Sequence, residues 1–247
     1  MPLILVSNDD GIEAPGIKVL KEAVKDLGNT IVFAPKNNRS GASHSLTIHK
    51  SIKVKRINEN TYYSDGTPTD CILYSVRGIL KNKPDIVLGG INQGANLGSD
   101  VSYSGTVAVA MEGTLLGIPS IAFSQVDFDN YFDIAFAKKT AKWITEKVLR
   151  NKLPEGVFLN VNLPRIPNGK IKITCLGNRI YRDEIVKVRE EKGDFIYSLE
   201  GENPTWASSP NSDFDAIHEG FVSITPIHME YTDFNMIEKL RGWEEDY

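Results

Sequence analysis

Short apolar runs alternate with helical patterns along the first two thirds of the chain. Residues 3–6 and 86–88 are uninterrupted apolar runs, which are typical of strands buried on both faces. Between these runs, apolar residues recur at helical spacing at Ile17, Leu20 and Val24, and Gly28 closes the segment. The alternation continues, with further strands predicted at 30–34, 119–123 and 157–161 and helices at 106–116 and 132–149.

Local signals support these boundaries. Pro35 ends the second predicted strand, because proline cannot donate to a sheet. Another helix is predicted to open at residues 67–70, where Thr67 can cap, Pro68 suits the first turn and Asp70 favours the positive end of the helix dipole. Strands that alternate with helices indicate right-handed βαβ units. We therefore expect a Rossmann-like α/β fold, a mainly parallel sheet with helices on both faces.

The pattern changes after about residue 165. Segments 170–174, 186–189 and 195–199 have the composition of strands separated by polar turns. Residues 221–225 predict one further strand, which Pro226 is expected to end. We therefore expect a single domain, 1–247, made of an α/β catalytic core (1–165) and a β-rich extension (166–247).

Composition excludes several classes of protein. The chain has 247 residues, 41% of them hydrophobic, and a net charge of -4, which argues against a generally basic nucleic-acid-binding surface. No apolar run approaches the ~18 residues of a membrane span, so we expect no membrane partner. Two cysteines, Cys71 and Cys175, do not form a disulfide framework and lie among apolar residues. We expect both to be buried free thiols in a cytoplasmic protein.

The first of three polar clusters at predicted strand ends is SNDDG at 7–11. The adjacent carboxylates of Asp9 and Asp10 repel each other unless a cation or a proton lies between them. A plain turn remains the alternative, because Asn, Asp and Gly are common turn residues. The second cluster, at 37–45, contains Arg39, Ser40 and His44; most of its members, taken singly, also fit a solvated loop.

The third cluster is the most specific. The sequence GGINQGANLGSD at 89–100 follows a predicted strand and continues through Ser104, Gly105 and Thr106 into a helix. Glycines allow the backbone to approach a ligand, and Ser-Gly-Thr at a helix N-terminus directs amide donors at an anion. The spacing matches neither the P-loop nor the dinucleotide-binding fingerprint. It predicts a phosphate cradle of a different kind.

Together the clusters offer oxygen ligands and no sulfur: the carboxylates of Asp9 and Asp10, the Ser40 hydroxyl and the Asn92 amide. Such a set favours Mg²⁺, Mn²⁺ or Ca²⁺ over zinc. A cation held by one or two carboxylates beside an anion cradle is typical of phosphoryl transfer or phosphate-ester hydrolysis.

These segments resemble the SurE family of survival proteins, which are metal-dependent nucleoside-monophosphate phosphatases. The resemblance covers nearly the whole chain. It is carried by SNDDGIEAPG near the start, RSGASHSLT at 39–47, DGTPTDC at 65–71, GGINQGANLGSDVSYSGTVAVAMEG at 89–113, PSIAFS at 119–124, LNVNLP at 159–164 and GFVSITPI at 220–227. Lys50 departs from the proline that relatives often have there, which concerns only the local loop path.

The resemblance implies hydrolysis of nucleoside 5′-monophosphates, with 3′-nucleotides and short polyphosphates as further substrates. It implies one divalent ion per subunit, Mg²⁺ or Mn²⁺, on Asp9, Asp10, Ser40 and Asn92. It places the phosphate against Asn96, Ser104, Gly105 and Thr106. It also implies a C-terminal extension exchanged between subunits, hence a homodimer or homotetramer with no nucleic-acid polymer as partner.

The catalytic role of the aspartates stays open between Asp9 and Asp10. One of them would orient or deprotonate the attacking water, and Asp9 is favoured. Two other functions remain. In an aspartyl-phosphate phosphatase one aspartate would be the nucleophile, although such enzymes separate their two aspartates by one residue. A non-catalytic nucleotide-sensing module would use the same cradle, but two extra negative charges would weaken anion binding unless a metal bridges them.

Overall fold

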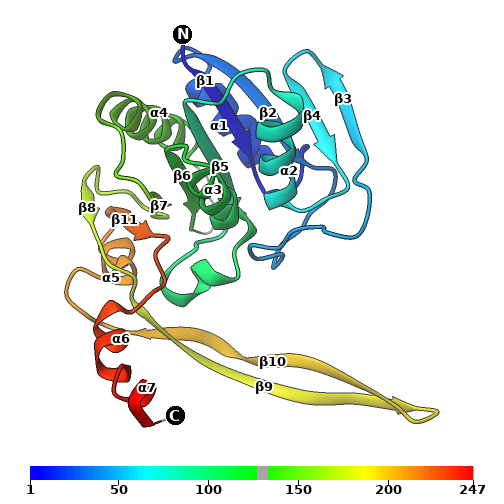
Figure 1. Cartoon of the computed structure of the whole chain (residues 1–247), viewed down its shortest axis with the longest axis vertical. Helices are drawn as coiled ribbons and strands as arrows, with labels where there is room; N and C mark the ends of the chain where they lie inside the picture. The colour runs from blue at the N-terminus through cyan, green and yellow to red at the C-terminus, as the bar shows by residue number, and fades with distance from the viewer. Residues whose placement is uncertain (127–132, 247) are drawn as a thin grey trace.

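A nine-stranded sheet forms the centre of the computed structural model, which describes residues 1–126 and 133–246 (Figure 1). The strand order is β3-β4-β2-β1-β5-β6-β7-β11-β8. In the order of the sheet, the neighbouring strands β4, β2, β1, β5, β6 and β7 all pair in parallel. At the two ends of this group, β3 pairs antiparallel with β4 and β11 pairs antiparallel with β7. The strands of this sheet, in chain order, are β1 (Leu3–Ser7), β2 (Asn29–Pro35), β3 (Val54–Asn58), β4 (Thr61–Ser64), β5 (Ile86–Gln93), β6 (Ser120–Gln125), β7 (Val157–Leu163), β8 (Ile171–Ile173) and β11 (Val222–His228).

Helices cover both faces of the sheet. Helices α1 and α4 pack together on one face, and α2 and α3 pack together on the other. The helical segments are α1 (Pro15–Val24), α2 (Pro68–Tyr74), the π-helical turn η1 (Ser75–Ile79), the 3-10 turn η2 (Gly98–Ser102), α3 (Gly105–Leu115), α4 (Ile134–Asn151), α5 (Asp213–His218), α6 (Phe234–Leu240) and α7 (Trp243–Asp246). The predicted Rossmann-like architecture is therefore confirmed.

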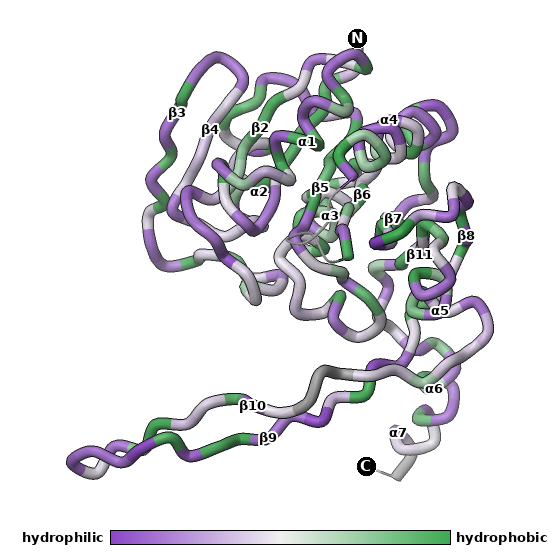
Figure 2. The backbone as a smooth tube through the Cα atoms, turned by 180° about the vertical axis from the view of Figure 1, so that it is seen from behind, coloured by the Kyte–Doolittle hydropathy of each residue, from purple (hydrophilic) through white to green (hydrophobic). Residues whose placement is uncertain are grey.

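The buried strands supply both layers of the core. Successive residues of a strand point to opposite faces, so Ile4 and Val6 pack with α1 and α4, whereas Leu5 packs with α2 and α3. Figure 2 shows the hydrophobic stretches gathered in the central strands of the sheet. Apolar runs such as residues 3–6 are unbroken because a layer of helices covers each side.

Several boundaries agree with the sequence. Thr67 caps α2 as predicted: its hydroxyl accepts from the Asp70 N–H, and the Asp70 carboxylate accepts from the Thr67 N–H. The prediction that Pro226 ends the last strand is wrong, because β11 continues to His228. The neighbouring β8 pairs only as far as Ile224. Beyond that point β11 is an edge on this side, where proline is tolerated.

The edge pair β3–β4 was not predicted. Strand β3 is mostly exposed and carries Lys55 and Arg56, so it lacks the apolar signature that marks the central strands. Exposed, charged edge strands are a common protection against edge-to-edge aggregation. Their sequence is therefore hard to distinguish from a loop.

The C-terminal segment has two parts. Strands β8 and β11 extend the main sheet, and α5 packs against β11. Strands β9 (Asn178–Glu191) and β10 (Asp194–Ala207) pair with each other as a long antiparallel hairpin that projects from the body (Figure 1). Hydrophobic and hydrophilic stretches both occur along it (Figure 2). The β-rich character predicted after residue 165 is confirmed, but helices α5 to α7 were not predicted.

The two cysteines differ in exposure. Cys71 is buried, as expected, and burial raises the pKa of its thiol to about 12. The expectation that Cys175 is also buried is wrong, because Cys175 is exposed. Its apolar neighbours Ile173 and Leu176 are themselves exposed, so an apolar sequence context did not indicate burial here. Within 1–126 and 133–246, no helix combines the length and apolarity needed to cross a bilayer.

Candidate active site

The predicted polar clusters meet at the edge of the sheet where the parallel strands end. Strands β1 and β5 are neighbours in the sheet. Strand β1 leads into α1 on one face of the sheet, whereas β5 leads into α3 on the other face. In open α/β sheets such a switch point forms a crevice outside the carboxyl ends of the strands. Ser7, the last residue of β1, pairs with Gly89 of β5. The loop after β1, which carries Asp9 and Asp10, therefore begins beside the last part of β5, which carries Asn92.

Asp9 is fixed against the N-terminus of α3. Only 4% of Asp9 is exposed, and the Thr106 hydroxyl donates a hydrogen bond to its Oδ1. Burial raises the pKa of the Asp9 carboxyl, and hydrogen bonds from the Thr106 hydroxyl and from the backbone N–H groups of Thr106 and Gly105 offset part of this effect. The positive end of a helix stabilises a carboxylate. Asp9 is thus held as a rigid, buried acid.

Gly105 is required for this arrangement. A Cβ atom at this position would lie 2.6 Å from Asp9 Cβ and 2.9 Å from Asp9 Oδ2. These separations are well below the ~3.5–4.0 Å of an ordinary carbon contact. Only glycine allows α3 to approach the carboxylate so closely.

Asp10 contacts the end of β5, where the glycine-rich loop begins. The Gln93 N–H donates to Asp10 Oδ2 at 3.3 Å. The adjacent Asn92 side chain donates from Nδ2 to the carbonyl of Gly94 at 2.9 Å, which leaves its Oδ1 as a ligand atom for a cation. The structure therefore brings Asp9, Asp10 and Asn92 into one region.

The Ser40 loop is attached to the same region. The Arg39 N–H donates to the Asp9 carbonyl at 2.7 Å, so the residue next to Ser40 lies against Asp9. Ser40 itself is exposed, and its N–H donates to Asn38 Oδ1 at 2.6 Å. The predicted ligand Ser40 thus lies on a loop that borders the aspartates.

His44 fastens the far side of this loop to α3. Its Nε2 lies 2.9 Å from Glu112 Oε2, and Glu112 is buried. The Ser43 hydroxyl donates to the Ser102 carbonyl at 2.7 Å. These contacts hold the loop over the turn that precedes α3.

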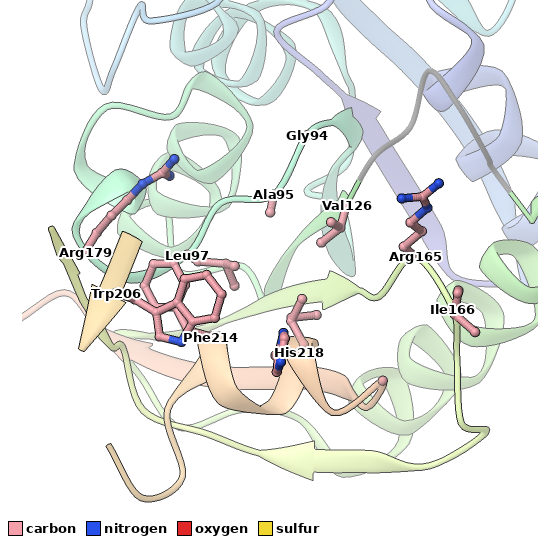
Figure 3. Close-up of a pocket in the computed structure, with 12 residues that line it drawn as sticks. Gly94, Ala95, Leu97, Val126, Arg165, Ile166, Arg179, Trp206, Phe214 and His218 are labelled. Carbon is pink, nitrogen blue, oxygen red and sulfur yellow. The ribbon is translucent and has the colours of Figure 1, made fainter. Parts of the chain in front are cut away.

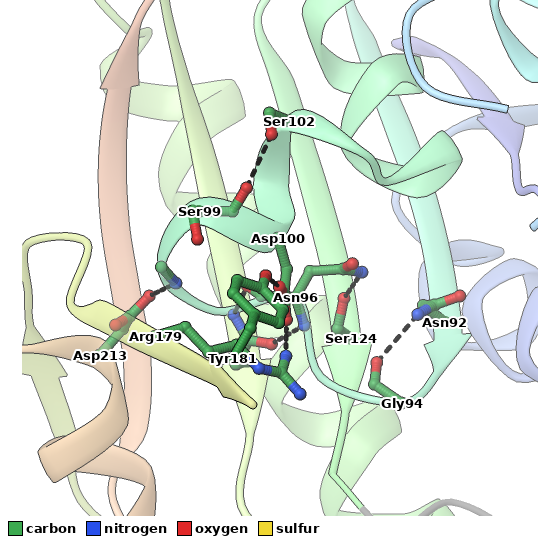
Figure 4. A network of polar contacts seen from close by, with 12 residues as sticks. Asn92, Gly94, Asn96, Ser99, Asp100, Ser102, Ser124, Arg179, Tyr181 and Asp213 are labelled. Carbon is green, nitrogen blue, oxygen red and sulfur yellow. Dashed lines mark hydrogen bonds and ion pairs between the residues drawn. The ribbon is translucent and has the colours of Figure 1, made fainter. Parts of the chain in front are cut away.

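The residues predicted to bind phosphate already have partners within the chain. Asn96 is 7% exposed; its N–H donates to Asn162 Oδ1 at 2.9 Å and its Nδ2 donates to Ser124 Oγ at 2.8 Å (Figure 4). The Ser104 hydroxyl caps α3 by accepting from the Val107 N–H at 3.1 Å. Gly105 and Thr106 face Asp9. Contact with a phosphate stays a prediction for all four residues.

The residues present fit a divalent cation. Asp9 and Asp10 offer two carboxylates. Burial raises the pKa of Asp9, and a bound cation would lower this pKa because it favours the ionised carboxylate. In the described part of the chain, no three His, Cys, Asp or Glu side chains form a metal-binding group. A cation here would therefore draw on hydroxyl and amide oxygens, which suit Mg²⁺ or Mn²⁺ better than zinc.

Sequence reasoning missed three anchors of the site. Helix α3 consists mainly of small and apolar residues, and Glu112 is its one charged residue. This contrast could have marked Glu112 as a residue with a specific partner. Asp213 accepts hydrogen bonds from the N–H groups of Gly98 and Gly177, both at 2.8 Å. Asp100 pairs with Arg179 and accepts from the Tyr181 hydroxyl (Figure 4). The segment that contains Gly98 and Asp100 is therefore tied to the first residues of the β9–β10 hairpin.

Comparisons with known proteins identify the family. The family model described as "Survival protein SurE" matches residues 4–183. The chain is 42% identical to a protein of Aquifex aeolicus over 99% of both chains, and 45% identical to one of Legionella pneumophila (strain Lens) over 96% of this chain and 95% of that one. Both relatives are named 5′-nucleotidase SurE. The crystal structure of the SurE protein from Aquifex aeolicus superposes with a TM-score of 0.88 at 41% identity, covering 98% of this chain and 100% of the other. The chain belongs to the SurE family.

Proposed function

We propose that this protein is a divalent-metal-dependent 5′-nucleotidase, which hydrolyses nucleoside 5′-monophosphates to nucleoside and phosphate. The observation that carries the proposal is the meeting of Asp9, Asp10 and Asn92 at the switch point of the sheet. Relatives of nearly equal length and over 40% identity are named 5′-nucleotidases, which supports the same assignment.

Asp9, Asp10, Ser40 and Asn92 would hold one Mg²⁺ or Mn²⁺ ion per subunit. When bound, such an ion supplies positive charge to the phosphoryl oxygens and lowers the pKa of a coordinated water. The chain contributes rigidity: Asp9 is fixed by Thr106 and α3, and Asp10 by the Gln93 N–H.

One aspartate would orient or deprotonate the water that attacks phosphorus in line. Asp9 is the better candidate, because the Thr106 hydroxyl and the N-terminus of α3 hold its carboxylate in one position. Its burial and its hydrogen bonds also restrict access to phosphorus, which disfavours covalent attack by Asp9 itself. These contacts support the nucleotidase over an aspartyl-phosphate mechanism.

Asn96 and the turn formed by Ser104, Gly105 and Thr106 are proposed to face the phosphate. The N-terminus of α3 provides a positive potential for an anion in addition to Asp9. The Asn96 loop is braced by Asn160 and Asn162, whose side chains donate to the Asn96 carbonyl at 2.8 and 2.9 Å. A braced loop favours a fixed phosphate position.

The direct test is phosphate release from AMP and GMP with Mg²⁺ or Mn²⁺, with and without a chelator. We expect release that the chelator abolishes. Absence of metal-dependent release from every nucleotide would refute the proposal and favour a sensing module. Parallel assays with 3′-AMP and short polyphosphates would define the further substrates, and a fluoroberyllate adduct on an aspartate would support the covalent mechanism instead.

We also propose that the β9–β10 hairpin joins subunits in a homodimer or homotetramer. Its apolar side chains are strongly exposed, with Ile185 at 75% and Leu199 at 71%. These two residues lie opposite each other in the two strands, so the hairpin carries an exposed apolar pair. Sedimentation of the wild type and of a variant carrying both I185D and L199D tests the proposal, because only the variant should be monomeric.

A further inference from the structure

Two cavities flank the loop at 164–170. The larger one includes Arg165 and Ile166 in its wall and adjoins the glycine-rich loop of the candidate active site (Figure 3). The other, of about 340 Å³, lies between α4 and the strands β8 and β11, at the outer edge of the sheet (Figure 1). Its volume is within the range of binding pockets, roughly 300–1,000 Å³. The described residues that line it are not those of the candidate active site, so the two cavities are separate.

The wall of this second cavity is largely apolar and partly exposed. Helix α4 contributes Phe136 and Trp143, and the sheet contributes Ile171 and Val222. Trp143 is 44% exposed and Ile171 is 38% exposed. Ile173, two residues further along β8, is 64% exposed and lies on the same face of the strand as Ile171. The cavity therefore continues into exposed apolar side chains along the outermost strand.

The backbone edge of β8 is open beside these side chains. The Lys170 carbonyl accepts a hydrogen bond from β11 at 3.0 Å, and the Thr174 N–H donates one to β11 at 3.0 Å. Backbone groups of successive residues in a strand point to opposite sides, so those of Ile171 and Ile173 point away from β11. Within the described chain, β8 pairs with β11 alone. An outward row of backbone donors and acceptors is a template for an additional strand.

The charged side chains of the cavity wall are both cationic. They are Lys139 and Lys170, and neither forms an ion pair with another residue of 1–126 or 133–246. Other lysines of α4 and β8 are each paired with an acidic residue: Lys138 with Glu22, Lys142 with Asp26 and Lys172 with Glu219. On a chain with a net charge of -4, the cavity thus presents two lysines that are available to carboxylates.

Two simpler explanations account for only part of these features. Lysines on a short edge strand protect a sheet from aggregation, but this role explains neither the exposed Ile173 nor the cavity beside Ile171. A second copy of this chain is a poor partner, because pairing of β8 with itself would bring Lys170 and Lys172 close to the same lysines of the other copy. An acidic strand meets neither objection.

We propose that the open edge of β8, together with the cavity between α4 and β8, binds an extended acidic segment of another protein. The segment pairs with β8 as an added strand and places an aromatic or large aliphatic side chain between Trp143 and Ile171. Its carboxylates lie against Lys139 and Lys170. In such strand addition, main-chain hydrogen bonds give affinity and pockets for alternate side chains give specificity. The inference does not depend on the nucleotidase function.

The binding test uses a short fluorescein-labelled peptide in which Phe and Val alternate with Glu. We expect saturable binding by fluorescence anisotropy, and none for a peptide with Lys in place of every Glu. A variant with both Lys139→Glu and Lys170→Glu should bind the acidic peptide about tenfold more weakly, and Trp143→Ala should also bind it about tenfold more weakly. The matched control carries Lys21→Glu and Lys81→Glu, at two exposed positions outside the cavity wall, and should bind as the wild type does.

Amide hydrogen exchange tests strand addition separately from charge. In the peptide complex, the N–H groups of Ile171 and Ile173 should exchange about tenfold or more slowly than in the free protein, because they become donors to the peptide. The Lys172 N–H, which points toward β11, should change little. Lys139 and Lys170 are exposed, so the charge-reversed variant keeps the binding test decisive if Trp143→Ala folds poorly.

Three results would overturn the proposal. The first is the absence of binding by the acidic peptide, or equal binding by the acidic and basic peptides. The second is unchanged exchange at Ile171 and Ile173 in the complex, which would show that the peptide does not extend the sheet. The third is a smaller oligomer in sedimentation of the charge-reversed variant, with no peptide binding by the wild type, which would assign this edge to a second copy.

Discussion

The close approach of α3 to Asp9 can be tested by replacing Gly105 with alanine. The added methyl group would lie 2.6 Å from Asp9 Cβ and 3.1 Å from Asp9 Cγ. Removing the overlap requires a movement of about 1 Å to reach ordinary contact distances. Asp9 is buried and hydrogen-bonded by Thr106, so it cannot move without weakening those bonds.

The expected loss can be stated from these contacts. Inserting a methyl group into a packed site costs about 1–3 kcal/mol, and replacing glycine with alanine in a helix returns at most about 1 kcal/mol. With the full return of about 1 kcal/mol subtracted, the net destabilisation is about 0–2 kcal/mol, which lowers Tm by up to roughly 8 °C for a chain of this size. A misplacement of about 1 Å at the reacting centre reduces kcat/KM about 100-fold.

The assay combines thermal unfolding with AMP hydrolysis at saturating Mn²⁺. Gly78→Ala is the matched control, because a Cβ at Gly78 meets no atom within 4 Å. It should leave kcat/KM unchanged and Tm equal or slightly higher. If Gly105→Ala matched the wild type in both Tm and kcat/KM, the inferred contact between α3 and Asp9 would be refuted.

Three further substitutions test other contacts. Because burial raises the pKa of Asp9, ionised Asp9 destabilises the metal-free fold above that pKa, so Asp9→Asn in chelator should unfold at a higher temperature than the wild type at neutral pH. The gap should narrow as the pH falls through the raised pKa, where Asp9 takes up a proton; a lower Tm for Asp9→Asn at every pH contradicts this. His44→Ala removes the partner of Glu112 and should raise the Mn²⁺ concentration for half-maximal activity about tenfold, whereas an unchanged metal titration would exclude a role in positioning Ser40. Asp213→Ala leaves the N–H groups of Gly98, Gly177 and Phe214 without their acceptor. The free energy of unfolding, measured in urea, should fall by about 3 kcal/mol or more. A fall of less than about 1 kcal/mol would mean that water replaces the carboxylate as the acceptor.

The parts of the fold that the sequence predicted are those set by neighbouring residues. The apolar run at 3–6 followed by Asn8, Asp9 and Asp10 identifies both a buried strand and the polar loop at its end. The cap of α2 is equally local, because Thr67 and Asp70 are three residues apart. The family motifs are also contiguous segments, so they could be recognised without knowing which distant residues meet in the fold.

The missed features depend on partners far along the chain. His44 meets Glu112 across 68 positions, and Asp213 reaches Gly98 across 115. No periodicity in a single sequence indicates such pairings. The exposure of Cys175 was mispredicted for the related reason that its apolar neighbours lie outside the core: Ile173 ends the outer strand β8, and Leu176 lies in the loop that follows.

The two ends of the β9–β10 hairpin differ in how they are attached to the rest of the chain. At the root, Arg179 and Tyr181 contact Asp100, which belongs to the loop that leads into α3. Toward the tip, β9 and β10 pair as strands only with each other within the described chain. Mutations near the tip can therefore change the length and the surface of the hairpin over evolutionary time without disturbing the segment that carries Asp100. Mutations at the root act on both at once, so this short segment should diverge most slowly within the hairpin.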